Sequence, residues 1–195
     1  MTMYMVSYGS LLSEFSRKHH SGVYDKVVPA SLSGWRRAWC ARYADEGTTY
    51  AGAFKDPLAT ISAILIPTQI TDGLRQRERH YNFVSVSQSD IYCEEPIAPS
   101  KDTFWVCEAR EVEYPVVKYP LPQSYVDTCL IGCREINHQF ARQFIKETTG
   151  WKSSWVNDRK TPIFPRFAQI TESQERWIDQ LLDECGVLSF RSDQK

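Results

Sequence analysis

The stretch that decides the fold is Met3-Tyr4-Met5-Val6-Ser7-Tyr8-Gly9-Ser10-Leu11. Its first four residues form an apolar run of buried-strand length, and Tyr8-Gly9-Ser10 then allows a sharp turn. The turn predicts a positive φ at Gly9, because glycine accepts that conformation without steric cost. A strand that ends in this way points the N–H groups of Gly9, Ser10 and Leu11 outward, in an arrangement that can hold a carboxylate or a phosphate.

The length and charge of the chain narrow the function classes. The 195 residues fit one domain, 1–195, which can bury roughly 70% of the surface of its unfolded chain. The net charge is −1, from 23 basic and 24 acidic side chains, whereas a nucleic-acid binder that neutralises phosphates is markedly basic. We therefore expect a small-molecule partner and no nucleic acid.

The spacing of the cysteines and the short length of the apolar segments argue against a metal site, a membrane-spanning helix and a secreted protein. None of the six cysteines forms a C-x-x-C pair, and no histidine stands at zinc-finger spacing, so no metal site is expected. No segment approaches the roughly 20 apolar residues of a membrane span, and no secretory signal peptide is evident. The cysteines are interpreted as reduced thiols of a cytoplasmic protein.

The rest of the chain predicts an α+β fold. Strands are expected at 34–43, 48–54, 59–66, 83–86 and 104–110, and helices at about 71–81 and 123–149. Both Arg36 and Arg37 are expected at the surface. A last helix begins with a capping box from Thr171 to Gln174 and ends at Gly186, within a C-terminal extension, 151–195, that packs on the same domain. Residues 87–103 are expected to form a lid or a surface loop.

One carboxylate stands in an unusual position. Ile70, Leu74, Glu78 and Tyr81 follow helical spacing, so Glu78 falls within the apolar stripe of an otherwise charged helix. A buried, unpaired carboxylate costs several kcal/mol, so it is either paired or used in chemistry. The sequence allows both interpretations: an ion pair with Arg77 or Arg75, or a functional acid/base.

Three motifs, taken together, resemble the γ-glutamylcyclotransferase-like family. They are Tyr8-Gly9-Ser10-Leu11-Leu12, the segment 74–81 that contains Arg77-Glu78, and Pro122-Gln123-Ser124-Tyr125 followed by Gly132. They occur in the family's order across residues 4–132, about two thirds of the chain. The chain departs from the family at Arg75, where the family usually has aspartate.

The resemblance implies a fold, a reaction and a set of site residues. The fold is a small mixed β-barrel with flanking helices. The reaction is that of an enzyme which closes a γ-glutamyl compound to 5-oxoproline and expels the attached amine, as in glutathione metabolism, without a cofactor. Glu78 is implied as the catalytic acid/base. The implied substrate-binding residues are Ser7, Tyr8, Gly9, Ser10, Leu11 and Tyr125.

Two alternatives stay open at this stage. The chain could be a non-catalytic small-molecule-binding or interaction protein of the same fold. As an enzyme, it could act on γ-glutamylamines rather than on γ-glutamyl amino acids or peptides. Asp158-Arg159 and Arg166 could either bind a substrate carboxylate or form structural ion pairs. The sequence does not indicate the oligomeric state.

Overall fold

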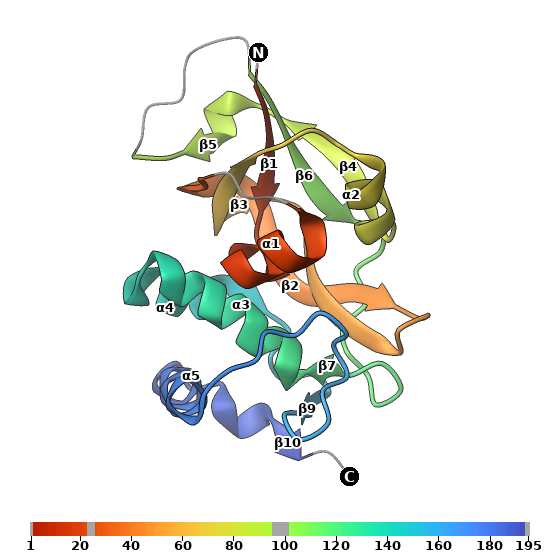
Figure 1. Ribbon diagram of the computed structural model, residues 1–195, viewed down its shortest axis with the longest axis vertical. Helices are drawn as coiled ribbons and strands as arrows, with labels where there is room; N and C mark the ends of the chain where they lie inside the picture. The colour runs from red at the N-terminus through yellow and green to blue at the C-terminus, as the bar shows by residue number, and fades with distance from the viewer. Residues whose placement is uncertain (1, 23–25, 95–101, 194–195) are drawn as a thin grey trace.

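The first strand lies at the centre of a curled sheet. The computed structural model describes residues 2–22, 26–94 and 102–193. Over these residues the main sheet has seven strands in the order β4-β6-β1-β3-β2-β5, with β8 (Thr148–Thr149) beside β2. β1 (Met3–Ser7) is antiparallel to β3 (Thr48–Pro67) and parallel to β6 (Thr103–Ala109). The turn after β1 therefore lies near the middle of the molecule (Figure 1).

A long hairpin forms most of the curl. β2 (Val28–Tyr43) pairs antiparallel with β3 from Val28 opposite Leu65 to Tyr43 opposite Thr48. The strands predicted at 48–54 and 59–66 are in fact one strand of 20 residues. Ala53 pairs with both Arg37 of β2 and Glu108 of β6, so the sheet closes partly on itself as a half-barrel.

The remaining strands lie at the edges of this sheet. β4 (Tyr81–Val86) pairs with β6, and β5 (Ile91–Tyr92) pairs with β2. The strands predicted at 83–86 and 104–110 are thus present with small changes of boundary. A 3-10 helix at Gln88–Asp90 and β5 occupy part of the predicted loop 87–103, of which residues 95–101 lie outside the described residues.

Helices cover one end of the half-barrel. α1 (Glu14–Ser21) follows the first turn, and α3 (Gln123–Ile136) and α4 (His138–Glu147) lie between the sheet and α5 (Glu172–Glu184) (Figure 1). The single helix predicted at 123–149 is wrong, because the chain breaks at Asn137. That residue has an extended backbone (φ −174°, ψ 170°), and its side chain accepts a hydrogen bond of 2.7 Å from Phe140 N, which caps α4.

The helix before Glu78 is also shorter than predicted. α2 (Asp72–Arg77) begins at a Thr71 cap, and Glu78 is its last, capping residue rather than a mid-helix position. The Glu78 amide still donates to Leu74 O at 2.9 Å, and Tyr81 then opens β4. Strand pairing of residue 81 with Ala109 ends the helix one turn early.

Arg37 overturns the expectation that both arginines of β2 lie at the surface. Its side chain is fully buried beneath the phenyl ring of Phe144, with its guanidinium carbon 3.9 Å from the ring centroid. It donates to the Ser62 and Phe144 carbonyls and forms an ion pair of 3.4 Å with Glu147. Buried charge is tolerated here because each group has several hydrogen-bond partners. Arg36, by contrast, pairs with Asp56 nearer the surface.

The C-terminal segment is joined to the rest by a small second sheet. Its strands β7 (Leu121–Pro122), β9 (Trp155–Asn157) and β10 (Ser192–Asp193) follow the order β10-β9-β7. Asp158 is buried and accepts hydrogen bonds from Ser124 N at 2.7 Å and Ser124 Oγ at 2.6 Å, at the start of α3. The capping box of α5 is confirmed. These contacts support the proposal that residues 151–193 are part of one domain with the sheet.

Candidate functional site

A cavity lies where β1 ends, and it brings together residues that are far apart in the sequence. The centres of water-sized molecules can occupy about 40 Å³ of it, and it opens to solvent. The walls come from the end of β1 and the turn after it, the part of the β2–β3 hairpin near its tip, the end of α2, β4, β6, the start of α3 and the loop before α5. The lining residues are Met5, Val6, Ser7, Tyr8, Gly9, Ser10, Leu11, Tyr43, Tyr50, Ala51, Arg77, Glu78, Tyr81, Cys107, Tyr125, Phe164 and Arg166. All seven residues predicted for the site are therefore on its wall.

Glu78 presents a carboxylate to this cavity. Only 12% of its side chain is exposed, and Arg77 Nε lies 3.2 Å from Glu78 Oε1. Burial raises the pKa of Glu78, while the positive charges of Arg77 and Arg166 act in the opposite direction. The ion pair with Arg77 is thus confirmed, and Glu78 also lines a cavity; its role as an acid/base stays a prediction.

Arg77 ties three elements together around Glu78. Its side chain is 7% exposed, and it donates to Ser21 Oγ at 2.6 Å, Ser16 Oγ at 3.0 Å and Ser10 Oγ at 3.2 Å. Sequence reasoning considered it only as an ion-pair partner. The sequence does not indicate that three serines, spread over the turn and α1, all contact the guanidinium of Arg77. Arg75, the other proposed partner, is exposed and lies over the Phe83 ring.

The turn after β1 is a single 3-10 turn, Ser10–Leu12 (η1). Its first hydrogen bond runs from Leu12 N to Gly9 O at 2.9 Å, so the amides of Gly9, Ser10 and Leu11 precede it and have no acceptor inside the turn. Ser7, the last residue of β1, is buried below them. The turn thus supplies N–H groups at the cavity wall from the backbone.

The prediction of a positive φ at Gly9 is wrong. Its φ is −127° and its ψ is −138°. The reason for glycine is space: a Cβ atom there would lie 2.9 Å from Tyr125 Oη and 3.6 Å from Ala51 Cβ. Tyr125 therefore limits what residue 9 can be, a contact across more than one hundred residues of chain that spacing within the turn does not reveal.

The tyrosine hydroxyls at the cavity bind the backbone of β3. Tyr81 Oη donates to Ala51 O at 2.6 Å, and Tyr125 Oη accepts from Ala51 N at 3.3 Å. Tyr8 Oη donates to Cys107 O and accepts from Ala53 N at 3.1 Å. Burial raises the pKa of each of these tyrosines well above its usual value. They therefore stay protonated.

The three C-terminal residues considered from the sequence have different fates. Asp158 caps α3, as described above. Arg159 forms an ion pair with Asp127 at 2.8 Å and another with Asp179 at 2.9 Å, away from the cavity. Arg166 lines the cavity, with its guanidinium over the Phe164 ring and its Nη1 3.4 Å from Glu46 Oε1. Only the last of them can meet a ligand near Glu78.

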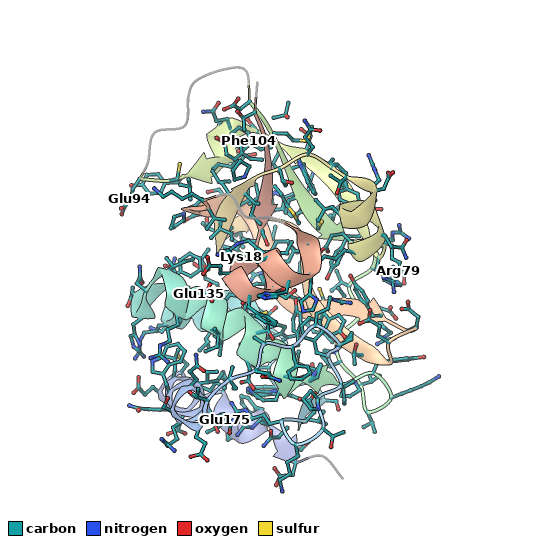
Figure 2. The ribbon with its side chains drawn as sticks, viewed as in Figure 1. Lys18, Arg79, Glu94, Phe104, Glu135 and Glu175 are labelled. Carbon is teal, nitrogen blue, oxygen red and sulfur yellow. The ribbon has the colours of Figure 1, made fainter. Side chains whose placement is uncertain are left out.

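Side chains fill the space between the sheet and the helices (Figure 2). Over the described residues, no three His, Cys, Asp or Glu side chains gather in a way that could hold a metal ion. Four cysteines, Cys40, Cys107, Cys129 and Cys133, are buried thiols. Within the same residues, no helix has the length and apolar character that crossing a membrane requires.

Comparison with known proteins identifies the fold. No family model matches the chain, and no curated protein matches it significantly. The solved structure of a gamma-glutamyl cyclotransferase aligns with 92% of this chain and 99% of its own, at a TM-score of 0.57 and 13% identity. An uncharacterized protein from Homo sapiens aligns with 91% of this chain and 98% of its own, at a TM-score of 0.53 and 13% identity. The resemblance seen in the motifs is thus confirmed for the fold: this chain has the α+β, half-barrel fold of the gamma-glutamyl cyclotransferases.

Proposed function

We propose that the protein is a γ-glutamylcyclotransferase-type enzyme, with Glu78 as its acid/base. The observation that carries the proposal is a cavity lined both by Glu78, whose side chain is largely buried, and by Gly9 to Leu11, whose amides have no acceptor inside the turn. The fold shared with a gamma-glutamyl cyclotransferase supports it. The proposed compartment is the cytoplasm, in keeping with the buried thiols.

The reaction needs positioning and one proton carrier. The α-amino nitrogen of the γ-glutamyl group attacks its own γ-carbonyl carbon, a C–N bond closes the five-membered ring, and the C–N bond to the leaving amine breaks. The amine must lose a proton to attack, and the leaving nitrogen must gain one. A single carboxylate can do both, and the products, 5-oxoproline and the free amine, together contain all atoms of the substrate.

The surroundings of Glu78 suit this task. A carboxyl group exchanges protons best when its pKa is close to the working pH, and burial moves the pKa of Glu78 upward in that direction. Arg77 limits the rise and holds the carboxylate in place through Nε. Negative charge that develops on the γ-carbonyl oxygen during attack would be stabilised by preorganised N–H donors.

The first test is the release of 5-oxoproline from glutathione, γ-glutamyl amino acids and γ-glutamylamines. We expect turnover of at least one class, and the panel also separates the substrate alternatives left open by the sequence. A wild-type protein that binds 5-oxoproline but converts none of these compounds would favour a non-catalytic binding protein of the same fold.

The second test is Glu78→Gln. The amide has nearly the same shape but cannot accept and return a proton, so we expect a loss of about 10² to 10⁴ in kcat with retained folding. Glu135→Gln is the matched control, because the pKa of Glu135 is also raised by burial, yet this residue accepts a hydrogen bond from Glu14 N outside the cavity. Near wild-type turnover in Glu78→Gln would contradict the assignment.

A further inference from the structure

Arg166 has hydrogen-bonding capacity that the described residues do not use. Its Nε atom is buried and has no hydrogen-bond partner among them, and the only contact of Nη1 is the weak one with Glu46 at 3.4 Å. The guanidinium is held over Phe164, with 5.1 Å between the guanidinium carbon and the ring centroid. An orphaned, buried donor on a cavity wall indicates a missing acceptor.

The other cavity arginine cannot take that role. Arg77 already donates to Glu78 and to three serine hydroxyls. Among the described lining residues the formal charges belong to Arg77, Glu78 and Arg166, which sum to +1. A γ-glutamyl group with its amine neutral for attack brings one negative charge, that of its α-carboxylate. The ligand and the cavity are thus complementary in charge.

We propose, on the basis of the function proposed above, that Arg166 binds the α-carboxylate of the γ-glutamyl group and of the 5-oxoproline product. Guanidinium and carboxylate form strong, charge-assisted hydrogen bonds, and a fork of two donors also fixes orientation. The amides of Gly9 to Leu11 are then left for the oxygen of the γ-carbonyl.

The assignment defines the substrate class. The site takes γ-glutamyl compounds whose α-carboxylate is free and rejects those in which it is an amide or an ester. It also gives the C-terminal segment a part in the site, because Arg166 and Phe164 come from the loop before α5 and meet the β2–β3 hairpin at Glu46.

The test compares two ligands of equal size. 5-Oxoproline carries the carboxylate, and 5-oxoprolinamide replaces it with a neutral amide. We expect calorimetric titration to show that the wild-type protein prefers the acid, and that Arg166→Gln weakens binding of the acid by about 10- to 100-fold while binding of the amide changes little. Arg166→Lys keeps the charge without the fork and should retain part of the preference.

Arg79→Gln is the matched control. Arg79 pairs with Asp45 and lies 3.7 Å from Glu46, the same carboxylate that Arg166 contacts, but it is not on the cavity wall, and Figure 2 shows it at the outer edge of the molecule. Its substitution should leave the preference for the acid unchanged, which excludes an effect through Glu46 alone.

The outcomes separate this inference from the function on which it rests. If Arg166→Gln, shown to be folded by its near-ultraviolet circular dichroism, prefers the acid as strongly as the wild-type protein does, Arg166 does not bind the carboxylate. If the wild-type protein releases 5-oxoproline from γ-glutamyl compounds but prefers neither ligand, only the Arg166 assignment fails. If it neither binds 5-oxoproline nor forms it, both proposals fail.

Discussion

Burial of Glu78, the proposed acid/base, makes the protein less stable at neutral pH. Because its pKa is raised by burial, the folded protein binds this proton more tightly than the unfolded chain does. Its contribution to stability is therefore greatest below the unfolded pKa, about 4.3, and is lost as the pH rises through the higher folded pKa. Active sites commonly carry such a cost.

This linkage predicts different pH profiles for wild-type protein and Glu78→Gln. The free energy of unfolding of the variant, minus that of the wild type, should increase with pH above about 4, at a slope of at most about 1.4 kcal/mol per pH unit. Urea unfolding from pH 4 to pH 8 measures it. Asp127 and Glu135, whose pKa values are also raised, contribute equally to both proteins and cancel. Parallel profiles would show that the pKa of Glu78 is unchanged by folding.

Gly9 and Tyr125 are in steric contact, so we expect substitutions at these two residues to have coupled effects on stability. Gly9→Ala places a methyl group 2.9 Å from Tyr125 Oη, so we expect a cost of about 1 to 3 kcal/mol. Tyr125→Phe removes that oxygen and the 3.3 Å hydrogen bond from Ala51 N, at about 1 kcal/mol. The double variant should lose less than the sum, because each change relieves the other, with a coupling of at least about 0.5 kcal/mol. Additive free energies from urea unfolding of all four proteins would exclude this steric coupling.

At the scale of elements, α3 packs directly against the backbone of the turn after β1. A Cβ atom on Gly132 would lie 2.2 Å from Ser13 N and 2.3 Å from the Leu12 carbonyl carbon, both backbone atoms. The helix can approach the turn only because this residue has no side chain. The position of the amides of Gly9 to Leu11 is therefore set by a helix that starts more than one hundred residues later in the chain.

Gly132→Ala should accordingly lower the free energy of unfolding by about 3 kcal/mol. It should also weaken 5-oxoproline binding in the protein that remains folded, because the turn must move. Gly73→Ala is its control. That glycine also lies in a helix, α2, but a Cβ atom there meets only Thr71 Oγ1 at 3.9 Å. It should gain up to about 1 kcal/mol from helix propensity. Thermal unfolding of both variants measures the contrast, and a mild effect of Gly132→Ala would mean that α3 can move away from the turn.

The elements also show what the sequence can and cannot predict. The apolar run of β1, the alternation in β2 and the capping box of α5 are local signals, and each predicted its element. The sequence pattern does not predict that one helix ends at Arg77 and another at Asn137. The first end depends on the pairing of β4 with β6, and the second on the Asn137 side chain, which caps α4. Helical periodicity continues through both positions, so the pattern alone gives no reason to end a helix there.

For the whole molecule, some residues of the candidate site can be predicted from local sequence motifs, whereas others depend on tertiary packing. Glu78, the turn and Tyr125 stand in short motifs, so the sequence could indicate them. Arg166 lies in a loop without a motif, so the sequence could name it only as one of three residues that either bind a carboxylate or form structural ion pairs. The reason to choose it is a buried donor without an acceptor among the described residues, which exists only once the C-terminal segment packs against the hairpin. Arg37 was assigned to the surface for a similar reason, since its partners lie 25 to 111 positions away.

The parallel pairing of β1 with β6 has a consequence for synthesis on the ribosome. Met3 pairs with Thr103, so β1 lacks one neighbour until about one hundred further residues have been made. At translation rates of about 5 to 20 residues per second, that is a delay of about 5 to 20 s, and pairings of such sequence separation are slow to form. During this interval an apolar strand edge is open to other chains, which is a hazard for aggregation. The sheet around the turn after β1 is thus completed only after β6 has been made.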